Sequence, residues 1–229
     1  MMSIENLAII PARGGSKGIK KKNLRKLNDL SLIEITLREI LRSKIFDKVI
    51  LSSDSQEILE HGRAIGVDAL KRPKALALDN TPSEKAITHV LSKYTKRYKI
   101  NNVGLFQPTS PLRDFKDIRN SFNEFQVNKN STLISVCSID RKYLKLLYKD
   151  KQKISPIKTN FPFMPRQDLP SAFLPNGAIY YAKANYFLKY ESFFSRNMGL
   201  FEMDSDKSLD IDSEDDLKIA EKLLASYSS

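Results

Sequence analysis

A short segment near the start of the chain combines three glycines with basic side chains. It follows the apolar run Leu7–Ile10 and reads PARGGSKGIKKKN over residues 11–23. Glycines let a backbone approach a ligand closely and turn its N–H groups toward phosphate oxygens, while Arg13, Lys17 and Lys22 add positive charge. The glycines at 14, 15 and 18 fit neither the dinucleotide fingerprint nor the Walker loop. The segment therefore predicts a phosphate site of another kind, with a plain turn as the alternative.

Two aspartates near the end of the chain, Asp210 and Asp212, are separated by one isoleucine. In an extended segment such residues face the same way, and Mg²⁺ prefers carboxylate oxygens beside substrate phosphates. The alternative is helix-capping acidity. We favour that alternative for Asp215 and Asp216, because Ser213 is a good N-cap for a helix that would carry them in its first turn.

A third polar group, Gln107, Thr109, Ser110 and Arg113, occupies the stretch FQPTSPLR. It follows an apolar run, and its two prolines fix the path of the loop. Ligands of open α/β sheets bind beyond the carboxyl ends of strands. The loop is thus a candidate for ligand binding, although an ordinary polar turn would look the same.

The elements that must hold these residues alternate along the chain. Short apolar runs predict strands and amphipathic segments predict helices, which together indicate βαβ units and a mostly parallel sheet. We predict one α/β domain over residues 1–229, with an inserted lid or dimerisation arm at about 140–176, where no clear period is present. Strands are expected at 7–10, 48–54 and 132–138, within 103–111 as a strand followed by a loop, and from 177. Helices are expected at 31–43, 55–66, 83–98, 115–128 and after 213.

Composition limits the function classes. The formal net charge is +11, which raises a nucleic-acid-binding alternative, but the basic residues are scattered and residues 202–221 are strongly acidic. The single cysteine, Cys137, allows no disulfide within the chain, so we expect a cytoplasmic protein. The N-terminus does not read as a signal peptide, and no apolar run is long enough to span a membrane.

The motifs together resemble the acylneuraminate cytidylyltransferases, the enzymes that make CMP-sialic acids. The resemblance covers nearly the whole chain and is carried, in order, by IPARGGSKGIKKKN, FDKVILSSDSQEI, RPKALALDNTPSEKAITHVL, LFQPTSPLR, RQDLPSAFLPNGAIYYAK and DIDSEDDL. One departure is Lys20, where related sequences commonly have proline. The resemblance implies a Rossmann-like nucleotidyltransferase fold.

The resemblance also implies a reaction. CMP would pass from CTP to the anomeric hydroxyl of a nine-carbon α-keto acid sugar, with release of pyrophosphate, Mg²⁺ or Mn²⁺ as cofactor, and a role in cell-surface glycan synthesis. It favours a metal at Asp210 and Asp212, and a homodimer whose arms close the active sites. It implies catalytic roles for Arg13, Lys22 and Asp212; nucleotide binding by Ala12, Arg13, Gly14, Ser16, Asn23, Arg72 and Ser83; and sugar binding by Gln107, Thr109, Ser110, Lys145, Arg166 and Gln167.

Several alternatives remain open at this point. A helix-capping role for Ser83 is as well supported as nucleotide binding. A cytidylyltransferase for the eight-carbon sugar Kdo is a near rival, although GGSKGI and the stretch from RQDLP to NGAIY favour the nine-carbon class. A nucleic-acid-binding protein is the rival from another class, and it predicts a contiguous basic face with interleaved aromatic side chains.

Overall fold

The structure is a computed structural model that describes residues 2–16 and 18–227, so Lys17 lies outside the described residues. A seven-stranded sheet with the order β11-β7-β10-β6-β1-β4-β5 forms its centre. All neighbouring strands pair in parallel except β10, which is antiparallel to β6 and β7. The predicted α/β fold with a mostly parallel sheet is confirmed. The strands are β1 (Met2–Pro11), β4 (Lys48–Ser53), β5 (Asp68–Lys71), β6 (Tyr98–Leu105), β7 (Thr132–Ile139), β10 (Ala172–Lys183) and β11 (Met198–Glu202).

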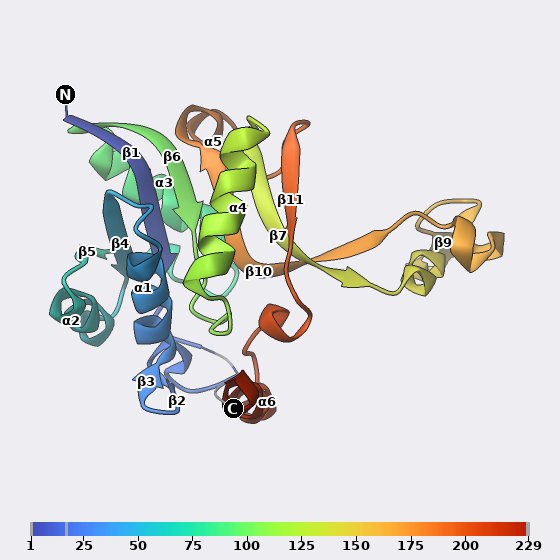
Figure 1. Ribbon diagram of the computed structural model, residues 1–229, viewed down its shortest axis with the longest axis horizontal. Coiled ribbons are helices and arrows are strands. Elements are labelled where there is room, and N and C mark those ends of the chain that lie inside the picture. The colour runs from blue at the N-terminus through green and yellow to red at the C-terminus, as the bar shows by residue number, and fades with distance from the viewer. Residues whose placement is uncertain (1, 17, 228–229) are drawn as a thin grey trace.

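Helices cover both faces of this sheet (Figure 1). One face is packed by α1, α2 and α4 through residues such as Leu37, Ile58 and Phe125, and the other by α3 and α5 through Val90 and Phe187. The remaining helix, α6, lies beyond the carboxyl end of β1. The helices are α1 (Leu32–Ser43), α2 (Gln56–Ile65), α3 (Ser83–Tyr94), α4 (Phe115–Val127), α5 (Ala184–Tyr190) and α6 (Glu214–Tyr227).

Local sequence explains where several elements begin. The residues Leu7–Ile10 are fully buried, as expected for a central strand. Ser31 caps α1 by accepting a hydrogen bond from the Glu34 N–H, and the Glu34 carboxylate accepts one from the Ser31 N–H in return. Asp114 and Asp117 form the same reciprocal cap at the start of α4. These caps fix the starts of α1, which follows the glycine-rich segment, and α4, which follows the FQPTSPLR stretch.

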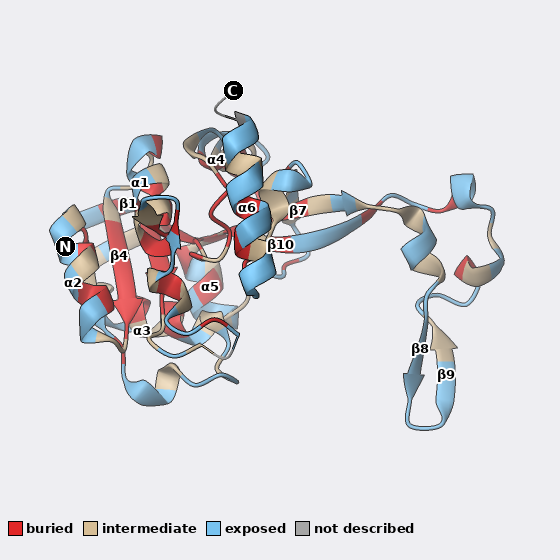
Figure 2. Ribbon diagram, turned by 90° about the horizontal axis from the view of Figure 1, so that it is seen from below, coloured by how far each residue is buried: buried red, intermediate tan, exposed pale blue. Residues whose placement is uncertain are grey.

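Residues 140–171 form an arm that projects from the body of the molecule (Figures 1 and 2). Its base is the antiparallel pair of β7 and β10, in which Ala172 pairs with Ile139. The returning strand therefore starts at Ala172 and not at Gly177, because β7 offers it a partner inside the irregular stretch. Beyond the base the arm contains η3 (Arg141–Lys145), η4 (Phe161–Phe163), η5 (Arg166–Asp168) and the hairpin of β8 (Leu147–Asp150) and β9 (Lys153–Pro156).

Candidate active site

A cleft lies at the carboxyl ends of the central parallel strands. The loops after β1, β5 and β6 and the segment before α6 all contribute to it, so motifs more than 100 residues apart meet at one edge of the sheet. This position is the usual one for a ligand site in an open α/β sheet. The lining residues are Pro11, Arg13, Gly15, Ser16, Lys22, Asn23, Arg72, Leu76, Ala77, Leu78, Asp79, Thr81, Ser83, Gln107, Pro108, Thr109, Asp210 and Asp212.

The glycine-rich loop is held closely against its surroundings. The Gly14 N–H donates to Asp54 Oδ1 at 2.9 Å, and a Cβ atom on Gly14 would lie 2.8 Å from the Ser55 Cβ. A Cβ atom on Gly18 would collide with the carbonyl oxygen of Asp212. Glycine is thus required at both positions for close packing. Of the predicted nucleotide-binding residues in this loop, Ala12 is fully buried and neither Ala12 nor Gly14 lines the cleft.

Lys22 links this loop to the C-terminal segment. Its Nζ lies 2.8 Å from Asp212 Oδ1 and donates to the carbonyl oxygen of Ile211 at 2.8 Å. Its backbone N–H donates to the Ser16 hydroxyl oxygen at 3.1 Å, which orders the turn that precedes it. The two catalytic candidates Lys22 and Asp212, predicted from motifs 190 residues apart, are therefore in direct contact.

Two arginines supply further positive charge. The Arg13 guanidinium forms an ion pair with Asp79, and the Asn23 amide donates to the Arg13 carbonyl oxygen at 2.9 Å. Arg72 is almost fully buried, and its Nε has no hydrogen-bond partner among the residues that the structure describes. Burial lowers the pKa of Arg72, an effect that Asp54 opposes and Arg13 adds to. Both side chains remain able to bind an anion in the cleft.

The loop after β6 forms the opposite wall. Gln107 Nε2 approaches the Ser83 hydroxyl oxygen at 3.5 Å, and Thr109 accepts a hydrogen bond from the Ile211 N–H at 2.8 Å through its carbonyl oxygen. Ser83 is the first residue of α3, and Pro82 occupies the N-cap position, so Ser83 does not stand where the alternative capping role would place it. Ser110 is buried and does not line the cleft.

Arg113 fixes the same loop from inside the protein. Its guanidinium Nη1 donates to the carbonyl oxygens of Ala178 at 2.7 Å and Gln107 at 3.3 Å, and the group lies over the Phe106 ring at 5.4 Å. Burial lowers the pKa of Arg113 to about 10. This residue of the FQPTSPLR motif positions the loop that carries Gln107 and does not itself reach the cleft.

Asp210 and Asp212 have the chemistry of a divalent-cation site. Crowding by protein atoms raises the pKa of Asp210, a hydrogen bond from Thr109 lowers it, and the Asp212 charge raises it again. An added cation would relieve this unfavourable carboxylate environment. In the described ranges no three His, Cys, Asp or Glu side chains form a metal cage. Mg²⁺ commonly uses one or two carboxylates together with substrate phosphates, so the pair fits that ion.

The helix-capping expectation is confirmed for Asp216. Its Oδ2 accepts hydrogen bonds from the backbone N–H groups of Asp212 at 3.0 Å and Ser213 at 2.7 Å. The Ser213 hydroxyl also donates to this oxygen, at 2.8 Å. This bond and the two backbone bonds lower the pKa of Asp216, and the hydroxyl bond has the largest effect. Asp215 instead pairs with Lys218 on the exposed side of α6. Asp216 thus fixes the backbone that presents Asp212.

The predicted sugar-binding residues divide between two places. Gln107 and Thr109 line the cleft, whereas Lys145, Arg166 and Gln167 lie on the arm. Arg166 pairs with Asp140 at 3.1 Å and borders a shallow hollow with Gln167. Within one chain the structure does not bring the arm residues to the cleft.

Several cleft residues were not assigned by sequence reasoning. Asp79, the partner of Arg13, lies in the stretch RPKALALDN but has no predicted role, and the apolar residues 76–78 carry no local signal. Lys207 was also missed: its Nζ contacts Asp114 at 2.8 Å and Asp117 at 3.1 Å, and so ties the segment before Asp210 to the start of α4. Its partners are 93 and 90 residues away in sequence, which no local pattern reveals.

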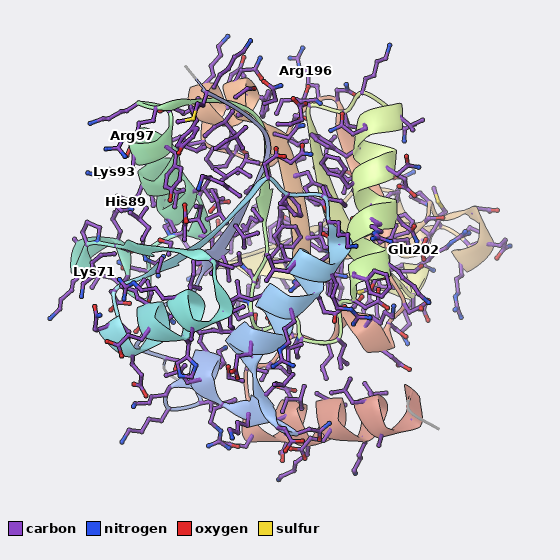
Figure 3. The ribbon with its side chains drawn as sticks, turned by 60° about the vertical axis from the view of Figure 1, so that its left-hand side comes forward. Lys71, His89, Lys93, Arg97, Arg196 and Glu202 are labelled. Carbon is purple, nitrogen blue, oxygen red and sulfur yellow. The ribbon has the colours of Figure 1, made fainter. Side chains whose placement is uncertain are left out.

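A row of basic side chains lies apart from the cleft. Lys71 on β5, Lys93 on α3 and Arg97 just after α3 are exposed, and the half-buried His89 of α3 lies between Lys71 and Lys93 (Figure 3). Close by, the rings of Tyr94 and Tyr98 stack with their centroids 6.1 Å apart. Basic side chains also suit the C-terminal end of a helix such as α3, so this row does not require a polyanionic ligand.

None of the helices in residues 2–16 and 18–227 has the length and apolar character that crossing a bilayer requires.

Comparisons with known proteins give a consistent result. The model of the family described as Cytidylyltransferase matches residues 7–228. A post-translational flagellin modification protein B of Campylobacter coli is 35% identical, with 96% of this chain and 95% of that protein aligned.

Two further relatives have names that describe a reaction. A CMP-N,N'-diacetyllegionaminic acid synthase of Campylobacter jejuni is 36% identical over 96% of this chain and 95% of its own length. An N-acylneuraminate cytidylyltransferase of Escherichia coli O18:K1:H7 is 34% identical over 96% of this chain. The chain spans about half of that relative, 52% of its length.

Among solved structures, a CMP:2-keto-3-deoxy-manno-octonic acid synthetase complexed with CTP aligns with a TM-score of 0.75. The alignment covers 97% of this chain and 99% of the other, at 14% identity. This likeness is one of fold, and it confirms the predicted nucleotidyltransferase fold.

Proposed function

The chain belongs to the cytidylyltransferase family, and from this membership we propose that it transfers CMP from CTP to a nine-carbon α-keto acid sugar. The anomeric oxygen of the sugar attacks the α-phosphorus, the bond from that phosphorus to the β-phosphate bridging oxygen breaks, and pyrophosphate leaves. The hydroxyl proton is released. The observation that carries the proposal is the meeting of Arg13, Lys22, Asp210 and Asp212 in one cleft.

The charges of the cleft suit this reaction. Phosphoryl transfer depends mainly on positioning and on neutralisation of phosphate charge. Arg13, Lys22 and Arg72 present three positive groups from the loops after β1 and β5, while Ser16 and Asn23 order the first loop around them. We assign the triphosphate to this side of the cleft. Charge that develops on the transferring and leaving phosphates would be stabilised by Arg13 and Lys22.

We propose Mg²⁺, replaceable by Mn²⁺, as the cofactor, held by Asp210 and Asp212 together with phosphate oxygens. The ion would neutralise phosphate charge when bound. The Asp210→Asn variant tests the site, because it removes charge and keeps shape. It should abolish Mg²⁺-dependent turnover while the circular dichroism spectrum stays that of the wild type. Near-normal activity would exclude a metal role for Asp210.

The sugar is assigned to the wall formed by Gln107 and Thr109. The names of the relatives at 34% and 36% identity, for N-acylneuraminate and N,N'-diacetyllegionaminic acid, support a nine-carbon acid. The Kdo alternative is supported by a neighbour of the same fold at 14% identity, which is evidence of fold alone. Pyrophosphate release with CTP, Mg²⁺ and each of N-acetylneuraminate, N,N'-diacetyllegionaminate, pseudaminate and Kdo would test the assignment. A preference for Kdo would overturn it.

We also propose that the protein works as a homodimer in the cytoplasm, the compartment that supplies CTP. The arm exposes apolar side chains, among them Phe163 with 91% of its surface accessible, Ile154 and Leu147. Such surface normally packs against a partner, and two-fold dimers are the commonest assembly. In this arrangement Lys145, Arg166 and Gln167 would bind the sugar carboxylate in the cleft of the other subunit. A monomeric mass by light scattering would contradict the dimer.

A further inference from the structure

We propose that Lys22 serves as an internal cation at Asp212 in the ligand-free protein, and that the nucleotide frees this carboxylate for the metal by drawing Lys22 away. The inference rests on the proposed function, since it concerns the same phosphate and metal sites. Metal and nucleotide then bind in a coupled way, and Lys22 is the residue that couples them.

The contacts of Lys22 support this role. A lysine ammonium has three N–H donors, and two of them are directed to the C-terminal segment: one to Asp212 Oδ1 at 2.8 Å and one to the Ile211 carbonyl oxygen at 2.8 Å. Only 16% of the Lys22 side-chain surface is accessible, compared with 75% for Asp212. The Lys22 side chain is therefore largely buried, and its ammonium is held at the carboxylate.

The backbone holds Lys22 in this position from both sides. Its N–H donates to the Ser16 hydroxyl oxygen and to the Ile19 carbonyl oxygen, each at 3.1 Å. Gly18 lies so close to the Asp212 carbonyl that a Cβ atom would not fit. The glycine-rich loop and the C-terminal segment thus touch where the ammonium and the carboxylate meet, so a ligand can separate these two groups by moving side chains while the backbone stays in place.

Charge then makes the two ligands interdependent. A divalent cation that takes Asp212 Oδ1 must displace the ammonium or share the carboxylate with it, and like charges at such short distances repel. A triphosphate offers Lys22 another anionic partner in the same cleft. Metal alone should therefore bind weakly and nucleotide should strengthen its binding, and by linkage the metal strengthens the binding of nucleotide equally.

Mn²⁺ titration of the nucleotide-free protein, followed by electron paramagnetic resonance, tests whether Lys22 competes with the metal for Asp212. Lys22→Gln should bind Mn²⁺ about 10- to 100-fold more tightly than the wild type, the range expected for loss of one charge-assisted contact. Lys21→Gln is the matched control, because its ammonium pairs with Glu57 at 2.7 Å and should not affect Mn²⁺. The gain should disappear when Asp212→Asn is combined with Lys22→Gln.

Calorimetric titration of CTP in EDTA tests whether the contact of Lys22 with Asp212 weakens nucleotide binding. Without metal, Asp212→Asn should bind CTP several-fold more tightly than the wild type, because Lys22 no longer has to leave a carboxylate. The gain must disappear in the combined Asp212→Asn and Lys22→Gln variant. If it persists there, the effect is general repulsion and Lys22 is not the coupling residue. Asp215→Asn, whose carboxylate pairs with Lys218, controls for net charge.

Two outcomes separate this inference from the proposed function. If wild-type protein with CTP, Mg²⁺ and the sugar panel releases no pyrophosphate, the proposed function fails. If it turns over but Lys22→Gln binds Mn²⁺ as weakly as the wild type, the inference fails and the function stands. Circular dichroism of each variant establishes that it is folded.

Discussion

Mixing two inactive variants should restore activity if the arm of one subunit completes the cleft of the other. Lys22→Ala removes a cleft residue, and Arg166→Ala removes a residue of the arm. Arg166 pairs with Asp140 at the base of its own arm, and within one chain it does not line the cleft. In a mixed dimer, one site would then carry both substitutions and the other site would carry neither.

The size of the recovery follows from this geometry. Random exchange between equal amounts of the two variants produces about half mixed dimers, and each mixed dimer has one intact site of two, so about a quarter of wild-type activity should return. If Arg166 acted within its own chain, every site would keep one defect. The mixture would then show only the average of the two residual activities.

The assay is pyrophosphate release after the purified variants are mixed and allowed to exchange subunits. Lys22→Ala mixed with Gln107→Ala is the control, because both residues line the same cleft of one chain and their mixture should not recover. Mass spectrometry of the intact dimers measures the mixed fraction. An absence of recovery with Arg166→Ala, when mixed dimers are present, would refute the exchange of arms.

Three further predictions concern single substitutions. Arg166→Lys should lower kcat/KM for the sugar by about 10- to 100-fold, because lysine cannot offer two parallel donors to a carboxylate; an equal loss toward CTP in steady-state kinetics would contradict a carboxylate role. Lys207→Met should reduce the free energy of unfolding in urea by roughly 2 kcal/mol, since it leaves two half-buried carboxylates unpaired; an unchanged midpoint would exclude this contribution. Burial alone would raise the pKa of Asp68, but hydrogen bonds from Lys48 and Tyr94 outweigh it, and the pKa in the folded protein is lowered. The ionised Asp68 therefore stabilises the fold above its unfolded pKa near 4, and this contribution is lost as the pH falls through the lower folded value. Asp68→Asn should therefore be less stable than the wild type at pH 7 by under about 1 kcal/mol, given its exposure, with a smaller difference at pH 3; a difference that grows on acidification would reverse the assignment.

The sequence predicts those parts of the fold that depend on local pattern. Buried runs such as Leu7–Ile10, followed by glycine or polar loops and amphipathic helices, are enough to indicate the parallel sheet and the edge where ligands bind. The edge strands β5 and β11 escape this reasoning. Their residues are largely exposed or half-buried, so they lack the apolar run that identifies a central strand.

Many residues of the candidate site could be predicted from sequence, but the contacts between them could not. Gly18, Lys22 and Asp212 belong to recognisable motifs, yet the contact of Lys22 with Asp212 and the ion pair of Arg13 with Asp79 depend on how distant segments come together. The direction of the arm is also a tertiary property, because it follows from where β7 and β10 leave the sheet. Local sequence carries no information on such placements.

The position of β10 in the sheet has a consequence for the order of folding during synthesis. The strands β5, β4, β1 and β6 are contiguous in the sheet and can assemble once β6 has left the ribosome. The next strand along the chain, β7, does not touch them, because β10 lies between it and β6. In a nascent chain that ends before Lys183, β7 therefore lacks the complete β10 as its partner. Its unpaired backbone groups can then pair with other chains, which leads to aggregation. The arm is synthesised in that interval, so slow translation of residues 140–171 would prolong the most vulnerable stage of folding.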